Sequence, residues 1–170
     1  MATDDAAPAI VRAATAADAA AVARIYNHYV AETVVTFEEE PVAVEEIGRR
    51  MEVVQAAGLP WLVAEEAGAV VGYAYAGKFH ARRAYRHSCE VTVYLAPQAC
   101  GRGLGVLLYT RLLALLAERG VHAAVGSITV PNPASVALHE KLGFKKVGHL
   151  EQVGWKFNRW LDVGYWQRLL

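Results

Sequence analysis

Residues 90–119 constrain the fold of this chain more than any other stretch. Apolar and polar residues alternate from Glu90 to Leu95, which is the period of a half-buried strand. Pro97 cannot donate a hydrogen bond to a sheet, so the strand should end before it. After Gly105 leucines recur at helical spacing. The stretch therefore predicts a strand, a tight loop over residues 98–105 and a buried helix.

The loop carries Gly101, Gly103 and Gly105 directly before the predicted helix. Glycine lacks a Cβ, so the backbone can turn sharply and approach a ligand closely. The first amides of a helix are free, and the helix dipole adds partial positive charge there. These properties favour a phosphate or pyrophosphate site, while a purely structural glycine turn fits the spacing too. The loop lacks the Gly-Lys-Ser/Thr ending of a nucleotide-hydrolase P-loop, and no acidic residue follows in dinucleotide-binding style.

Composition excludes several functions. The 17 basic and 17 acidic residues give no formal net charge, so the positive field typical of nucleic-acid-binding proteins is not expected. The longest apolar run, residues 106–117, is interrupted by Arg111 and is too short to span a membrane. Residues 1–8 do not resemble a signal peptide. Cys89, Cys100 and the six histidines have no metal-type spacing, so we expect no metal and a reducing, cytoplasmic environment.

The remaining chain reads as alternating strands and helices. Strands are predicted at 9–13, 61–66, 70–79, 90–95, 121–130, 144–153 and 160–168. Helices are predicted at 15–30, 41–58, 104–119 and 132–143, with Asn132 as an N-cap and Pro133 in the first turn. The order indicates an α/β protein with antiparallel outer strands and near-parallel central ones. We expect one domain over residues 9–170 after a flexible tail, residues 1–8.

Two motifs in this framework resemble the GNAT acyltransferase superfamily. Gln98-x-x-Gly101-x-Gly103 after a strand is similar to its acetyl-coenzyme A signature, and residues 132–144, which end in Leu-Gly-Phe, are similar to its downstream helix. The resemblance implies a mixed, mostly antiparallel twisted sheet flanked by helices, with splayed central strands. It also implies acetyl-CoA as co-substrate, held by Val93, Tyr94, Leu95, Gln98, Gly101, Arg102, Gly103, Leu104, Gly105, Val106, Asn132, Ser135 and Lys141.

Direct attack of an amine on a thioester needs a group that takes the amine proton, donors for the oxyanion and an acid for the departing thiolate. Glu90 is the candidate for the first role, as a base or as a ligand of the ammonium group. The alternative is a solvated carboxylate at a strand end. His139 is the candidate acid, at a position where many GNAT enzymes carry tyrosine. The alternative is a histidine satisfied within the core.

A longer resemblance, over about residues 10–167, is to the phosphinothricin and methionine sulfoximine N-acetyltransferase branch. It is carried by the segments 25–38, 72–76, 83–86, 90–94 and 153–163. It implies acetylation of the α-amine of small glutamate-like amino acids, and a homodimer with the C-terminal tail near the partner. Substrate contacts are expected from Phe37, Arg83, Tyr85, Glu90 and Asn132. Arg83 can hold a carboxylate or phosphinate at two points; its alternative is a solvated loop charge, and that of Asn132 is a helix cap.

Other functions remain open from sequence. The chain could be a GNAT enzyme for another small amine or for a protein N-terminus. It could also be a catalytically silent acyl-CoA-binding sensor, which would keep Gly101, Gly103 and Gly105 but need neither Glu90 nor His139. These alternatives differ in whether an amine is acetylated and in which one.

Overall fold

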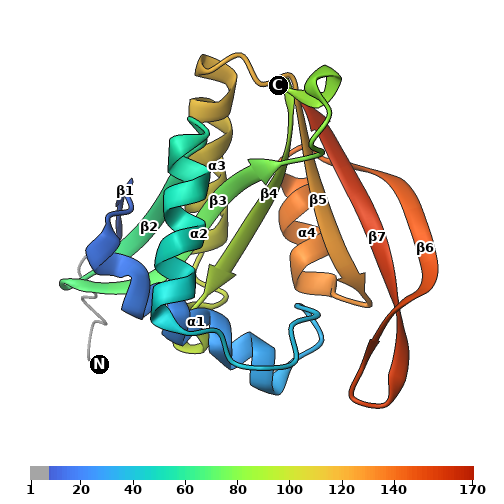
Figure 1. Ribbon diagram of the computed structural model, residues 1–170, viewed down its shortest axis with the longest axis horizontal. Coiled ribbons are helices and arrows are strands. Elements are labelled where there is room, and N and C mark those ends of the chain that lie inside the picture. Colours follow the sequence, from blue (N-terminus) through green and yellow to red (C-terminus); the bar gives the residue numbers. More distant parts are fainter. Residues whose placement is uncertain (1–7) are drawn as a thin grey trace, which may run out of the picture.

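The computed structural model describes residues 8–170, so most of the predicted tail lies outside the described residues (Figure 1). Within residues 8–170, seven strands and four α-helices follow one another. The strands are β1 (Ile10–Ala13), β2 (Trp61–Glu66), β3 (Ala69–Lys78), β4 (Ser88–Leu95), β5 (Ala123–Val130), β6 (Lys145–Lys156) and β7 (Arg159–Leu169). The helices are α1 (Ala19–Glu32), α2 (Val44–Ala56), α3 (Leu104–Glu118) and α4 (Pro133–Lys141).

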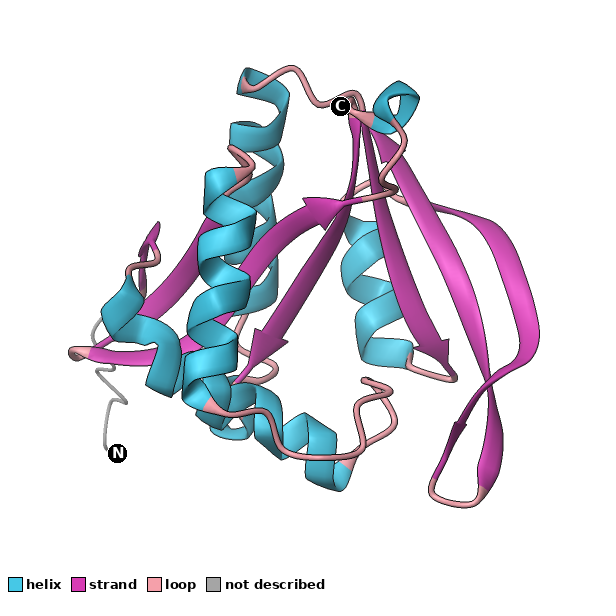
Figure 2. Ribbon diagram, in the orientation of Figure 1, coloured by secondary structure: helices cyan, strands magenta, loops and turns pink. Residues whose placement is uncertain are grey.

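All seven strands form one sheet in the order β1-β2-β3-β4-β5-β7-β6. Every neighbouring pair is antiparallel except β4 and β5, which are parallel. That parallel pairing covers only Ser88–Glu90 against Ala123–Val125, so the two strands diverge beyond Glu90 (Figure 2). The predicted mixed, mostly antiparallel sheet with splayed central strands is confirmed.

Helices cover both faces of the sheet, as Figure 1 shows. On one face α1 and α2 bury Val22, Ile47 and Met51 against β2 and β3. On the other face α3 buries Leu108 and Leu112, and α4 packs beside it. The sheet is therefore the middle layer of the fold, and the wedge between β4 and β5 opens within this layer. No helix in the described part of the chain is long and apolar enough to cross a membrane.

A local sequence signal sets the approach to α1, whereas the start of α2 depends on a longer-range contact. The Thr15 amide donates to the Asp18 carboxylate at 2.7 Å and starts the turn that leads into α1. The second helix, however, starts at Val44 and not at Pro41, so that boundary prediction was wrong. The Asn27 side-chain amide donates to the Val42 carbonyl at 2.9 Å and accepts from the Val42 amide at 2.8 Å. These two bonds tie the backbone before α2 to α1, and the chain is still extended at Ala43.

Candidate active site

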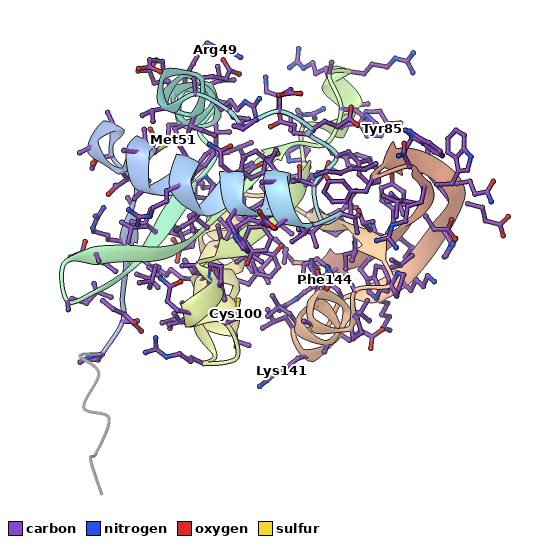
Figure 3. The ribbon with its side chains drawn as sticks, turned by 90° about the horizontal axis from the view of Figure 1, so that it is seen from below. Arg49, Met51, Tyr85, Cys100, Lys141 and Phe144 are labelled. Carbon is purple, nitrogen blue, oxygen red and sulfur yellow. The ribbon has the colours of Figure 1, made fainter. Side chains whose placement is uncertain are left out.

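A cavity of about 540 Å³ lies in the wedge where β4 and β5 separate. Beyond Glu90 the edge of β4 that faces β5 has no pairing to that strand, so its backbone groups are open to a ligand. Helix α4 and the start of α3 complete the walls. In Figure 3, Cys100 in the loop before α3 and Lys141 at the end of α4 lie on either side of this region.

The glycine loop forms one end of the cavity. Gly101 and Gly103 have φ angles of 76° and 83°, the left-handed region that glycine adopts without strain. A Cβ built on either glycine would meet open space, so both present bare backbone. The first bond of α3 runs from the Leu107 amide to the Gly103 carbonyl, and the three amides between them have no partner within the helix. The arrangement suits an anionic group such as a diphosphate.

Most residues that the sequence assigned to the coenzyme line this cavity. They are Val93, Tyr94, Leu95, Gly101, Gly103, Gly105, Val106, Asn132, Ser135 and Lys141. Three others do not line it. Leu104 is buried in the core and Gln98 lies in a short 3-10 turn outside the lining. Arg102 forms two bonds of 2.9 Å to the Glu66 carboxylate at the end of β2, which engages its guanidinium away from the lining residues.

Asn132 and Gly105 show how the sequence shapes the cavity locally. The Asn132 side chain accepts a hydrogen bond from the Ser135 amide at 3.2 Å, so it caps α4 as predicted while it also lines the cavity. A Cβ on Gly105 would lie 3.2 Å from the Leu138 side chain. Gly105 therefore lets α4 approach the first turn of α3, and the two helices together close the back of the wedge.

A second cavity, of about 560 Å³, holds Glu90. It is also lined by His80, Tyr85, Ser127, Tyr165 and Gln167. Val125 pairs with both Glu90 and Gln167, and Ser127 pairs with Tyr165, so sheet register brings these residues to one place. Ser127 lines both cavities and marks where they meet. Sequence reasoning missed Ser127, Tyr165 and Gln167, because strand pairing between distant segments leaves no local signal.

The predicted substrate residues are only partly brought together. Tyr85 and Glu90 share the second cavity, whereas Asn132 lines the first. Arg83 lies in the 3-10 turn Arg83–Tyr85 and lines neither cavity. Phe37 lies outside both linings, and its ring occupies the space that a Cβ on Gly154 would need.

His139 lies in the wall of the cavity beside the glycine loop and is enclosed, with 3% of its surface exposed. Its Nδ1 lies 2.7 Å from the Ser135 carbonyl oxygen, so Nδ1–H donates there and Nε2 is left as an acceptor. The Tyr109 hydroxyl lies 3.4 Å from Nε2 and also borders the cavity. A Cβ on Gly126 would overlap the imidazole, which fixes the ring against β5.

Burial lowers the pKa of His139, against the opposing effect of its bond to the Ser135 carbonyl. The imidazole is therefore held neutral near pH 7, which disfavours the protonated ring that a general acid would use. Burial also raises the pKa of Tyr109 well above its usual value, so its hydroxyl keeps its proton. Tyr109, which sequence reasoning missed, thus presents an O–H group beside a neutral histidine.

Among residues 8–170, no group of three or more His, Cys, Asp or Glu side chains is placed to hold a metal ion. Cys89 is buried, Cys100 is exposed, and both are free thiols.

Comparison with known proteins identifies relatives of this chain. Residues 11–164 match the family model described as acetyltransferase (GNAT) domain. The chain is 45% identical over 161 residues to the phosphinothricin N-acetyltransferase of Streptomyces viridochromogenes, covering 95% of this chain and 87% of that protein. It is 39% identical over 157 residues to the L-methionine sulfoximine/L-methionine sulfone acetyltransferase of Salmonella typhimurium, with 92% of each chain covered.

The fold of this chain is also similar to solved structures of acetyltransferases. A GNAT superfamily phosphinothricin acetyltransferase from Sinorhizobium meliloti, in complex with acetyl-CoA, superposes with a TM-score of 0.92 at 39% identity, over 95% of this chain and 88% of that one. A ribosomal-protein-alanine N-acetyltransferase from Brucella melitensis superposes with a TM-score of 0.93 at 42% identity, over 95% and 99% of the two chains.

Proposed function

Because the chain belongs to the GNAT acetyltransferase family, we propose that it transfers the acetyl group of acetyl-CoA to the α-amine of a small glutamate-like amino acid, such as phosphinothricin or methionine sulfoximine. Relatives named for these two acceptors share 37–45% of their residues with this chain over most of its length. The observation that carries the proposal is that two cavities meet at Ser127. One of them contains the bare glycine backbone and the other contains Glu90.

The cavity beside the glycine loop is proposed to hold acetyl-CoA. The unpartnered amides at the start of α3, beside Gly101 and Gly103, would hold the diphosphate, and the open edge of β4 from Val93 to Leu95 would hold the pantetheine arm. Ser135, Asn132 and Lys141 face this cavity from α4 and its cap. Acetyl-CoA supplies a thioester carbonyl as the electrophile. The same β4 edge provides backbone donors for an oxyanion.

The cavity around Glu90 is proposed to hold the acceptor. Glu90 would bind the ammonium group and take its proton, directly or through a water molecule, because a protonated amine is not a nucleophile. Tyr85 and Gln167 would add hydrogen bonds to the rest of the acceptor. Arg83, in the turn next to Tyr85, would reach a carboxylate or phosphinate only after its side chain moves, and Phe37 would flank the entrance.

The acid for the departing thiolate is proposed at the pair of His139 and Tyr109. The Tyr109 hydroxyl donates its single proton to Nε2 of the neutral His139 in this arrangement, and it would turn toward the cavity to give that proton to the thiolate. The bond from His139 Nδ1–H to the Ser135 carbonyl keeps the imidazole in place. In this assignment Tyr109, whose pKa is raised by burial, donates the proton. His139, whose pKa is lowered by burial, orients the Tyr109 hydroxyl.

We further propose that residues 9–170 form one domain and that two copies assemble as a homodimer in the cytoplasm. Support for the dimer comes from the hairpin of β6 and β7, where Val153, Trp155, Phe157 and Trp160 are all exposed although they are large and apolar. The two free thiols are compatible with a reducing compartment.

One observation favours a second candidate. The similar structure from Brucella melitensis is named as a ribosomal-protein-alanine N-acetyltransferase, so a protein N-terminus is an alternative acceptor. The relatives named for phosphinothricin and for methionine sulfoximine favour an amino acid instead.

A thiol-release assay with acetyl-CoA separates these functions. Phosphinothricin and methionine sulfoximine should be the best acceptors in a panel that also contains polyamines and an alanine-initiated peptide. Turnover of the peptide alone would replace the proposal with the second candidate. Tight acetyl-CoA binding without turnover of any amine would indicate an acyl-CoA sensor.

A further inference from the structure

Lys156, at the end of β6, is a buried lysine that serves neither cavity directly. Only 1% of its surface is exposed. Its Nζ donates to the Val30 carbonyl at 2.8 Å and to the Thr36 carbonyl at 2.9 Å. A buried ammonium is unfavourable unless its protons are satisfied, so these two long-range bonds account for its place in the fold.

The two acceptors lie at the ends of one short stretch of backbone. Val30 belongs to the last turn of α1, where carbonyls have no partner within the helix and the helix dipole is negative. Thr36 lies in the connection to α2. A single cation therefore fixes both the end of α1 and the segment that follows it, residues 33–38. Figure 1 shows this connection beneath the wedge, between α1 and the β6–β7 hairpin.

A second contact lies two residues away on the same hairpin. The Phe37 ring packs against Gly154 so closely that a Cβ on Gly154 would overlap it. The hairpin thus holds residues 33–38 at two points, one polar and one apolar. Within this segment Val35 lines the cavity proposed for acetyl-CoA, together with Ser127 and Thr129. The hairpin, which contributes no lining residue to that cavity, therefore sets the position of one of its walls.

We propose that Lys156 is a positioning residue for acceptor binding: with Gly154 it clamps residues 33–38, so that Val35 and Phe37 stay beside the acceptor's path to the thioester. The inference rests on the proposed function. Val35 lines the coenzyme's cavity, but the proposed diphosphate and pantetheine contacts belong to α3 and β4, so we assign Val35 to the remaining, acyl end of that cavity, where the amine enters. Loss of the clamp should therefore affect the amine more than acetyl-CoA.

Lys156→Met tests this inference, because it keeps the length of the side chain and removes the cation. The KM for methionine sulfoximine should rise at least tenfold, while the Kd for acetyl-CoA, measured by titration calorimetry, should change less than threefold. Lys145→Met is the matched control, since it removes an exposed lysine from the other end of the same strand and should leave both values unchanged. Equal losses for both substrates, or none, would overturn the inference.

Two further measurements keep the inference testable if Lys156→Met folds poorly, or if the wild-type enzyme acetylates a different acceptor. Gly154→Ala retains Lys156 but displaces the Phe37 ring, so it should raise the KM for the amine in the same way. Hydrogen exchange without substrate should show faster exchange at residues 33–38 in Lys156→Met, with β3 and β4 still protected. Unchanged exchange at residues 33–38 would refute the clamp whatever the acceptor is, whereas a wild-type enzyme that acetylates no amine would refute the proposed function alone.

Discussion

Replacing Gly103 with alanine tests whether bare backbone at the start of α3 binds the coenzyme. Gly103 has a φ angle of 83°, where a non-glycine residue costs about 1–2 kcal/mol. Lower entropy of the unfolded chain offsets about 0.4–1 kcal/mol of this cost. The net loss of about 1 kcal/mol should lower the Tm by about 2–4 °C for a chain of this size. The new Cβ would also point into open space that borders the cavity.

The binding effect should be larger than the stability effect. A methyl group beside the free amides would keep a diphosphate from approaching them, and a hydrogen bond to a charged group contributes about 1.5–3 kcal/mol. We therefore expect the Kd for acetyl-CoA, measured by titration calorimetry, to rise at least about tenfold, which corresponds to about 1.4 kcal/mol.

Gly120→Ala is the matched control. Gly120 follows the other end of α3, has a φ angle of 75°, and offers a Cβ the same open space, but it does not line the cavity. The Gly120→Ala variant should lose about as much stability as Gly103→Ala and keep the wild-type affinity for acetyl-CoA. If both variants bind the coenzyme as tightly as the wild type, the glycine loop is a structural turn and the reasoning is refuted.

Three other perturbations address the remaining proposals. Glu90→Gln should lower kcat/KM by about 10²–10⁴-fold with little change in the Kd for acetyl-CoA; an unaltered rate near neutral pH would remove Glu90 from the reaction. His139 has a lowered pKa in the folded protein, so below about pH 6.5 the unfolded chain binds more protons than the folded one, and the free energy of unfolding should fall as the pH falls. Urea unfolding at pH 5.5 and 7.5 should show a smaller pH dependence in His139→Gln, and an identical dependence in both proteins would contradict the assignment. Trp160→Glu places a charge on the exposed apolar hairpin and should convert a dimer into a monomer in light scattering; a variant that remains dimeric would exclude this surface as the interface.

Strand β4, the glycine loop, helix α3 and the start of α4 could be predicted from sequence because their signals are local. Pro97 ends β4, Gly103 supplies the left-handed residue before α3, and Asn132 caps α4, and each of these effects acts over a few residues. The start of α2 could not be predicted in the same way. It depends on hydrogen bonds between Asn27 and Val42, which are 15 residues apart.

The site was less predictable where it depends on pairing between distant segments. Arg102 fits a phosphate loop by position, yet its partner is Glu66, 36 residues earlier in the chain. Gln167 comes beside Glu90 only through the pairing of β5 with its two neighbours. His139 was recognised as a candidate, but its enclosure by Tyr109 and Gly126 comes from packing that the sequence pattern does not reveal.

The most direct test of the whole account is a crystal structure of the protein with acetyl-CoA. The account predicts that the diphosphate accepts hydrogen bonds from the amides at the start of α3, beside Gly101 and Gly103, and that the thioester lies near Ser127, between the two cavities. A complex in which the diphosphate binds elsewhere and leaves these amides to solvent would contradict it.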